Sequence, residues 1–155
     1  MFELIHFLHV ASGIVWAGGL VLLTLAVEPA VLRLEPDSIR TYLAAQARFA
    51  GPVMGMSGSL LLLTGFARAW IGGGVARFGD LFTTSYGLNV LAAFVIVIAV
   101  TAIAGRRRTL TMRLLAEEGD PRPALLASHR TFASLLSAAI LLVIAIMVIL
   151  GLGLY

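Results

Sequence analysis

Four long apolar runs constrain the fold of this chain more than any other feature. They cover about residues 4–27, 49–70, 86–104 and 132–154, and a helix needs about 20 apolar residues to cross a bilayer. Composition agrees, because 60% of the residues are hydrophobic and 12% are charged, against about 25% charged in a soluble domain. We therefore predict an all-α integral membrane four-helix bundle, with residues 1–155 forming a single transmembrane domain.

The arginines between the runs predict how the bundle is oriented. The connection after the second run carries Arg77, with Arg68 at its border. The connections after the first and third runs carry many more: Arg33, Arg40, Arg106, Arg107, Arg108, Arg113, Arg122 and Arg130. Because basic loops stay in the cytoplasm, both termini are expected on the outer, periplasmic side of a bacterial inner membrane, which the chain crosses as a multi-pass protein. The same rule explains the basic charge without a nucleic-acid partner.

The first run holds the strongest candidate site. His6, His9, Gly13, Trp16 and Leu20 are spaced by three or four residues and therefore share one helix face. An ionisable side chain inside a membrane helix marks a functional site by default. The small residues around it would let another helix or a flat cofactor such as a porphyrin approach closely.

Polar groups of the other runs fall in the same outer half of the predicted bundle. Arg68 could pair with the propionates of a bound heme, and Asn89 could donate a hydrogen bond beside the cofactor. Met147 offers a soft thioether ligand to a metal. His129, in contrast, is expected at the opposite, cytoplasmic end.

No candidate catalytic residues emerge from the sequence. The chain has no cysteine, and all eleven of its basic residues are arginines, which excludes iron–sulfur ligation and Schiff-base chemistry. No paired carboxylates and no nucleophile with a nearby base occur in the runs. Whether the protein is an enzyme stays open.

One motif resembles those of known families. His9, six intervening residues, Trp16 and the sequence Gly18-Gly19-Leu20 resemble the first helix of CopD-like copper-resistance proteins and of HemJ-type protoporphyrinogen oxidases. The end of the second run, Leu63 to Phe66, is similar to that of CopD-like proteins, so the resemblance covers the first half of the chain.

These two resemblances imply different functions. The HemJ resemblance implies heme b on His9, but the chain lacks that family's helix-three lysine, so the resemblance does not carry the oxidase activity over. The CopD resemblance implies copper handling near the outer face by His6, His9 and Met147.

Three functional hypotheses follow. The leading one is a heme b protein that transfers electrons to or from a quinone or another redox partner, with His9, His6, Trp16, Arg68 and Asn89 around the cofactor. The first alternative is a CopD-type copper-handling membrane protein. The second is a non-catalytic accessory subunit whose glycine faces dock onto a larger membrane complex. Membrane lipids surround the chain in each case, and a homodimer is compatible with all three.

Overall fold

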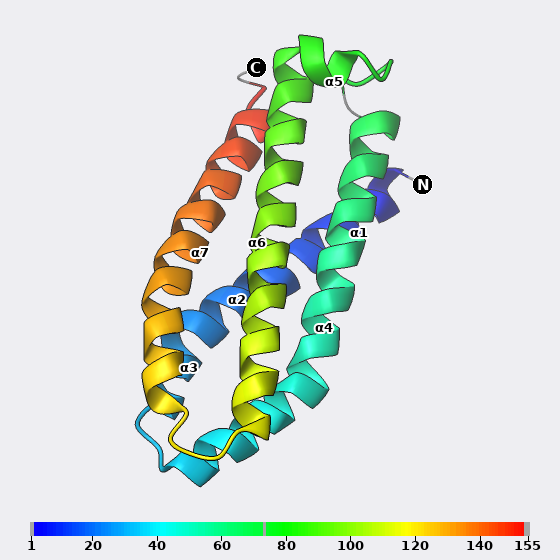
Figure 1. Ribbon diagram of the computed structural model, residues 1–155. Coiled ribbons are helices and arrows are strands. Elements are labelled where there is room, and N and C mark those ends of the chain that lie inside the picture. Colours follow the sequence, from blue (N-terminus) through cyan, green and yellow to red (C-terminus); the bar gives the residue numbers. More distant parts are fainter. Residues whose placement is uncertain (1, 73, 154–155) are drawn as a thin grey trace.

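The chain folds into four long helices, with one of them set obliquely to the others. The computed structural model describes residues 2–72 and 74–153, in which the backbone is helical and contains no strand. Figure 1 shows α4 (Pro36–Ile71), α6 (Ser85–Ala116) and α7 (Arg122–Gly151) as the upright members. A short helix, α5 (Asp80–Thr83), precedes α6 at the upper end. The first helix crosses behind α6, so its two halves reach different ends of the bundle.

The crossing helix is continuous but changes its winding twice. Its segments are α1 (Phe2–Gly13), the π-helical turn η1 (Ile14–Gly18), α2 (Gly19–Leu22), a second π-helical turn η2 (Leu23–Val27), and α3 (Glu28–Val31). The first apolar run was predicted to end at about residue 27, before Pro29, but the helix continues to Val31. Pro29 lies in α3, directly after η2. It has no N–H to donate within the helix, and the change of winding falls at this point.

All four predicted membrane spans are confirmed as helices long and apolar enough to cross a bilayer, within the described residues. The helices are nevertheless longer than the apolar runs. The 36 residues of α4 extend about 54 Å at 1.5 Å per residue, well beyond a hydrocarbon core of about 30 Å. The predicted last residue of the fourth run, Leu154, lies outside the described residues.

The connections predicted after the first and third apolar runs were too long. Glu28 is helical, and the three arginines at positions 106–108 lie inside α6. The connection between α3 and α4 is residues 32–35, and the connection between α6 and α7 is residues 117–121. A charge ends a hydrophobic run because lipid rejects it, but arginine and glutamate are good helix formers, so the backbone continues.

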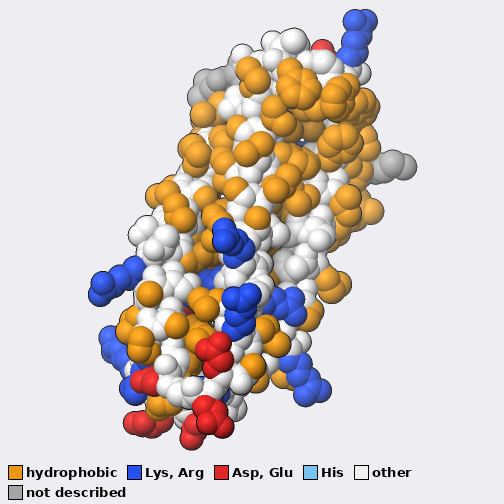
Figure 2. Space-filling model, viewed as in Figure 1, with side chains coloured by type: hydrophobic (Ala, Val, Ile, Leu, Met, Phe, Trp, Pro, Cys, Tyr) orange, Lys and Arg blue, Asp and Glu red, His pale blue; other side chains and the backbone are white. Residues whose placement is uncertain are grey.

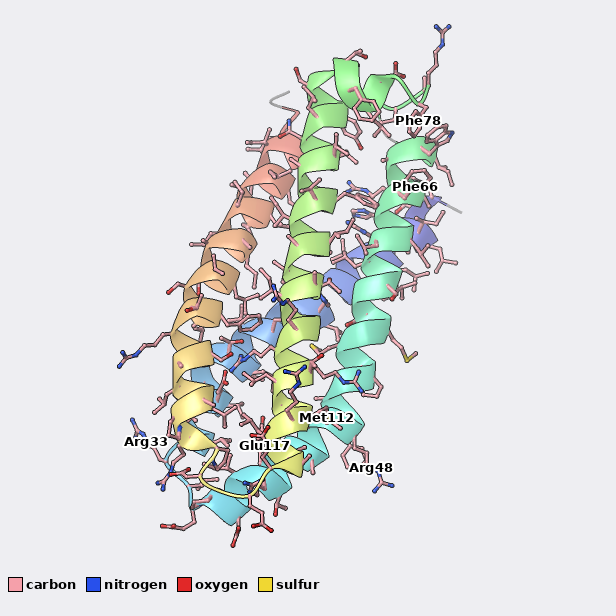
Figure 3. The ribbon with its side chains drawn as sticks, in the orientation of Figure 1. Arg33, Arg48, Phe66, Phe78, Met112 and Glu117 are labelled. Atoms are coloured by element: carbon pink, nitrogen blue, oxygen red, sulfur yellow. The ribbon has the colours of Figure 1, made fainter. Side chains whose placement is uncertain are left out.

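Charge gathers at one end of the molecule. Figure 2 shows most of the visible arginine and acidic side chains over the lower part of the face, while the upper part is mainly hydrophobic apart from a basic side chain and an acidic one at its tip. In Figure 3, Arg33, Arg48 and Glu117 mark the lower end, and Phe66 and Phe78 mark the upper end. The upper end is the one near which both chain termini lie in Figure 1.

Helix one packs closely against α4 through glycines. A Cβ on Gly58 would lie 2.8 Å from Nε1 of Trp16, and a Cβ on Gly65 would lie 3.0 Å from Cε1 of His9. Trp16 is 5% exposed and anchors the central core cluster. Close approach of these helices was predicted from their small residues. In the structure it depends on two glycines that each face a ring.

Candidate functional site

His9 is held in a fixed orientation by α4. Its Nδ1 lies 3.2 Å from the carbonyl oxygen of Leu61 and 3.2 Å from Oγ1 of Thr64. The Thr64 hydroxyl itself donates to the carbonyl of Leu60 at 2.6 Å, so it is an acceptor toward His9. With two acceptors at Nδ1, the neutral ring carries its proton there and keeps the lone pair on Nε2. A histidine oriented through one ring nitrogen is typical of metal ligation through the other.

His6 lies one turn before His9 on the same face. Its ring stacks on Phe2, with centroids 6.3 Å apart and planes 12° apart. Its Nδ1 is buried and has no hydrogen-bond partner among the described residues. A buried polar atom without a partner is costly, so this imidazole nitrogen has a hydrogen-bonding and ligating capacity that the described residues do not use.

Both histidines open into one cavity of about 590 Å³, which we call the histidine cavity. Its polar and sulfur-bearing lining comes from all four long helices and comprises His6, His9, Trp16, Arg68, Tyr86 and Met147. The rest of the lining is mainly aliphatic, with Phe94 beside it. The volume lies within the range of pockets that bind organic ligands, roughly 300–1,000 Å³.

Most residues predicted for the site converge on this cavity, and one does not. His6, His9, Trp16, Arg68 and Met147 all line it. Asn89 is absent from the lining, and its side-chain amide donates to the carbonyl of Ser85, 2.9 Å away. Tyr86, which the sequence analysis did not place in the site, stands there instead. Tyr86 and Asn89 are three residues apart on α6. The rotation of this helix about its axis therefore decides which of the two side chains lines the cavity.

A second polar cluster occupies the charged end and was missed by the sequence analysis. Glu28 forms a salt bridge with Arg107, and its other carboxylate oxygen lies 2.9 Å from Nδ1 of His129. The Arg107 guanidinium also sits over the Phe132 ring, 4.6 Å from the centroid. The side chains of Glu28 and Arg107 are 17% and 16% exposed. In the sequence, Glu28 stands out as an acid directly before a proline at the end of an apolar run. Its partners Arg107 and His129 are about 80 and 100 residues away in the chain, so the cluster could not be predicted.

His129 therefore belongs to the end opposite His6 and His9, as expected. It bonds to Glu28, which lies 22 residues after His6 on the first helix, or roughly 30 Å along it. Within the described part of the chain, no group of three or more histidines, cysteines and acids could hold a metal ion. A metal in the histidine cavity would thus need the thioether of Met147 beside the two imidazoles.

Comparison with known proteins identifies the family. The family model described as copper resistance protein D matches residues 43–151, which cover most of α4 and all of α5, α6 and α7. The match begins after the first helix, so Arg68 and Met147 lie within it and His6, His9 and Trp16 lie before it. No curated protein and no solved structure matches the chain. With 109 of 155 residues matched, the chain belongs to the copper resistance protein D family and is a multi-pass membrane protein related to copper resistance.

Proposed function

We propose that the protein binds cuprous copper inside the membrane, with His6, His9 and Met147 as ligands. The observation that carries this proposal is the pair of imidazoles that line one cavity. Nδ1 of His6 is buried without a partner among the described residues, and His9 is fixed through its own Nδ1. Met147 lines the same cavity.

The chemistry of this donor set suits copper in its reduced state. Imidazole and thioether are soft or borderline ligands, which favour Cu(I) over hard cations. All three ligands are neutral, so an empty site leaves no uncompensated charge in the bilayer. The membership of the chain in a copper-resistance family supports the same metal.

The proposed orientation places the histidine cavity in the outer half of a bacterial inner membrane. The support is the distribution of arginines, which gather at the end opposite this cavity (Figure 2) and would stay in the cytoplasm. In this orientation the site takes up copper from the periplasmic side.

Copper retention tests the proposal. The purified full-length protein, in detergent and under anaerobic conditions with ascorbate, is mixed with Cu(I), desalted and analysed by mass spectrometry. We expect His6→Ala/His9→Ala to retain clearly less copper than the wild type, and Met147→Leu to bind it more weakly because leucine removes the thioether. Met56→Leu is the matched control, because Met56 is 74% exposed. Equal retention by the wild type and the double histidine variant would overturn the proposal.

Heme b is the second candidate, favoured by the size of the cavity. A volume of about 590 Å³ exceeds what a metal ion needs, and Arg68 in the lining could pair with propionates. His9 would supply the axial nitrogen, and the group would then supply one-electron chemistry toward a quinone or another redox partner. A Soret band that appears on adding hemin and is lost in His9→Ala, but not in His129→Ala, would support heme. A featureless spectrum would dismiss it.

A further inference from the structure

A second cavity lies toward the charged end of the bundle, and we call it the arginine cavity. Its volume is about 270 Å³, and residues of all four long helices line it. The charged residues of its lining are Glu28, Arg107 and Arg108. Most of the remaining lining is apolar, and among the described residues it shares only Trp16 with the histidine cavity. The arginine cavity is therefore a separate site with both charged and apolar walls.

The charge of this cavity is not balanced within the described part of the chain. Glu28 is the one acid in its lining, and both of its carboxylate oxygens are engaged, one by Arg107 and the other by Nδ1 of His129. Arg108 forms no ion pair and no hydrogen bond with any described residue. One guanidinium is left without a counter-charge, so the ligand that complements this cavity is an anion.

A buried hydroxyl in the same lining also lacks a partner. Thr24 is 2% exposed and lines the cavity, yet its hydroxyl forms no hydrogen bond with any described residue. Thr101, in the same lining, donates to the carbonyl of Val97 at 2.7 Å, as threonines within helices commonly do. Buried polar groups are nearly always hydrogen-bonded. The O–H of Thr24 is therefore suited to donate to an oxygen of a ligand.

The depth of Arg108 in the membrane indicates which anion is near. Arg108 follows the end of the third apolar run, at about residue 104, by four residues, or roughly 6 Å along α6. Its side chain is exposed, and its Cζ would lie 4.0 Å from a Cβ on Gly51, so the guanidinium lies over α4. Hydrocarbon gives way to lipid headgroups at this depth, and basic pockets between membrane helices typically hold anionic headgroups.

We propose that the arginine cavity binds the headgroup of one anionic phospholipid. Arg108 pairs with the phosphate, and Thr24 donates to a headgroup oxygen. The apolar part of the lining packs against the first methylenes of the acyl chains. The volume of about 270 Å³ falls just below the range of pockets that enclose whole organic ligands, roughly 300–1,000 Å³, which suits a headgroup whose chains remain in the bilayer. Neither copper nor the histidine cavity takes part in this binding.

Lipid retention tests the site. The full-length protein is delipidated in detergent, mixed with phosphatidylglycerol or with zwitterionic phosphatidylcholine, and analysed by native mass spectrometry. We expect one phosphatidylglycerol per chain to be retained in preference to phosphatidylcholine, and Arg108→Gln to bind it about 10-fold more weakly. Arg106→Gln is the matched control, because it removes the same charge two residues away on α6 but outside the lining. Equal weakening by both variants would overturn the proposal, as would equal retention of the two lipids.

The interior of the cavity is tested by Thr24→Val. Valine keeps the shape of threonine but cannot donate a hydrogen bond, so we expect severalfold weaker retention of phosphatidylglycerol. Thr101→Val is the matched control, because the Thr101 hydroxyl already donates to Val97 and has no proton to offer a phosphate. Retention by Thr24→Val at the wild-type level would place the lipid outside the cavity and overturn the proposal.

Soluble glycerol phosphate separates a lipid from a free phosphate ester. It carries the same phosphate chemistry but no acyl chain, so an excess of it should leave phosphatidylglycerol bound. Displacement of the lipid by an equal concentration of glycerol phosphate would overturn the assignment to a lipid. Arg108 is exposed, so its replacement should leave the fold intact, and circular dichroism of each variant checks this.

Discussion

At the scale of single residues, the site is defined by how His9 is held. The sequence alone indicated that a histidine lay on a helix face with Trp16, and in the structure both residues line one cavity. The sequence could not show which ring nitrogen of His9 is hydrogen-bonded, because Leu61 and Thr64 are more than 50 residues away in the chain. Thr64 belongs to the stretch from Leu63 to Phe66 that resembles CopD-like proteins. In the structure its hydroxyl accepts a hydrogen bond from His9.

We predict that Thr64→Val weakens copper binding about 10-fold, as loss of a partner to a metal-ligating histidine commonly does. Valine keeps the shape of threonine but offers His9 no acceptor, so Nδ1 is left with the Leu61 carbonyl alone. Cu(I) affinity is measured by competition with a chromogenic chelator. Thr109→Val is the control, since its hydroxyl bonds only within α6, to Gly105. An unchanged affinity would show that the Thr64 contact does not orient the ligand.

At the scale of helices, existence was easier to predict than length or rotation. The apolar runs identified four spans, because hydrophobicity is a local property of the sequence. The ends at Glu28 and at positions 106–108 were misplaced, because the backbone stays helical through these charges and Glu28 pairs with Arg107 across the bundle. Asn89 and Tyr86 show the same limit for rotation, since packing against three other helices decides which of them faces the cavity.

The contact between helix one and α4 predicts a strong effect at Gly58. Gly58→Ala places a methyl group 2.8 Å from the Trp16 ring, and overpacking of this kind costs about 1–3 kcal/mol. Gly18→Ala is the control, because a Cβ there meets nothing within 4 Å and alanine favours helix. Thermal unfolding in detergent, followed by circular dichroism, should show a lower midpoint for Gly58→Ala alone. Equal midpoints would mean that the Trp16 ring moves aside freely.

The salt bridge between α3 and α6 predicts a second stability difference. Glu28→Gln leaves Arg107 charged and largely buried, and breaking a buried pair on one side costs about 3–5 kcal/mol. Asp120 and Arg122 form a comparable pair at 2.8 Å in which both side chains are about 40% exposed, so Asp120→Asn should leave the unfolding midpoint unchanged. A Glu28→Gln protein as stable as the wild type would show that Arg107 is satisfied by Phe132 or by water instead.

At the scale of the whole molecule, the direction of the bundle in the membrane decides where copper would enter. The structure separates a charged end, marked by Arg33, from an apolar end, marked by Phe78 (Figure 3). Because lipid headgroups and the cytoplasm both favour the arginines, the charged end is predicted to face inward. The histidine cavity, toward the other end, would then lie on the periplasmic side.

Single-cysteine labelling measures this direction, and the chain is suited to it because it contains no cysteine. We predict that a membrane-impermeant maleimide, added to intact spheroplasts, labels Phe78→Cys and does not label Arg33→Cys. After the membrane is permeabilised, both should react, which shows that each site is accessible in the folded protein. The reverse pattern would place the histidine cavity on the cytoplasmic side. Copper held by His6 and His9 would then have to come from inside the cell.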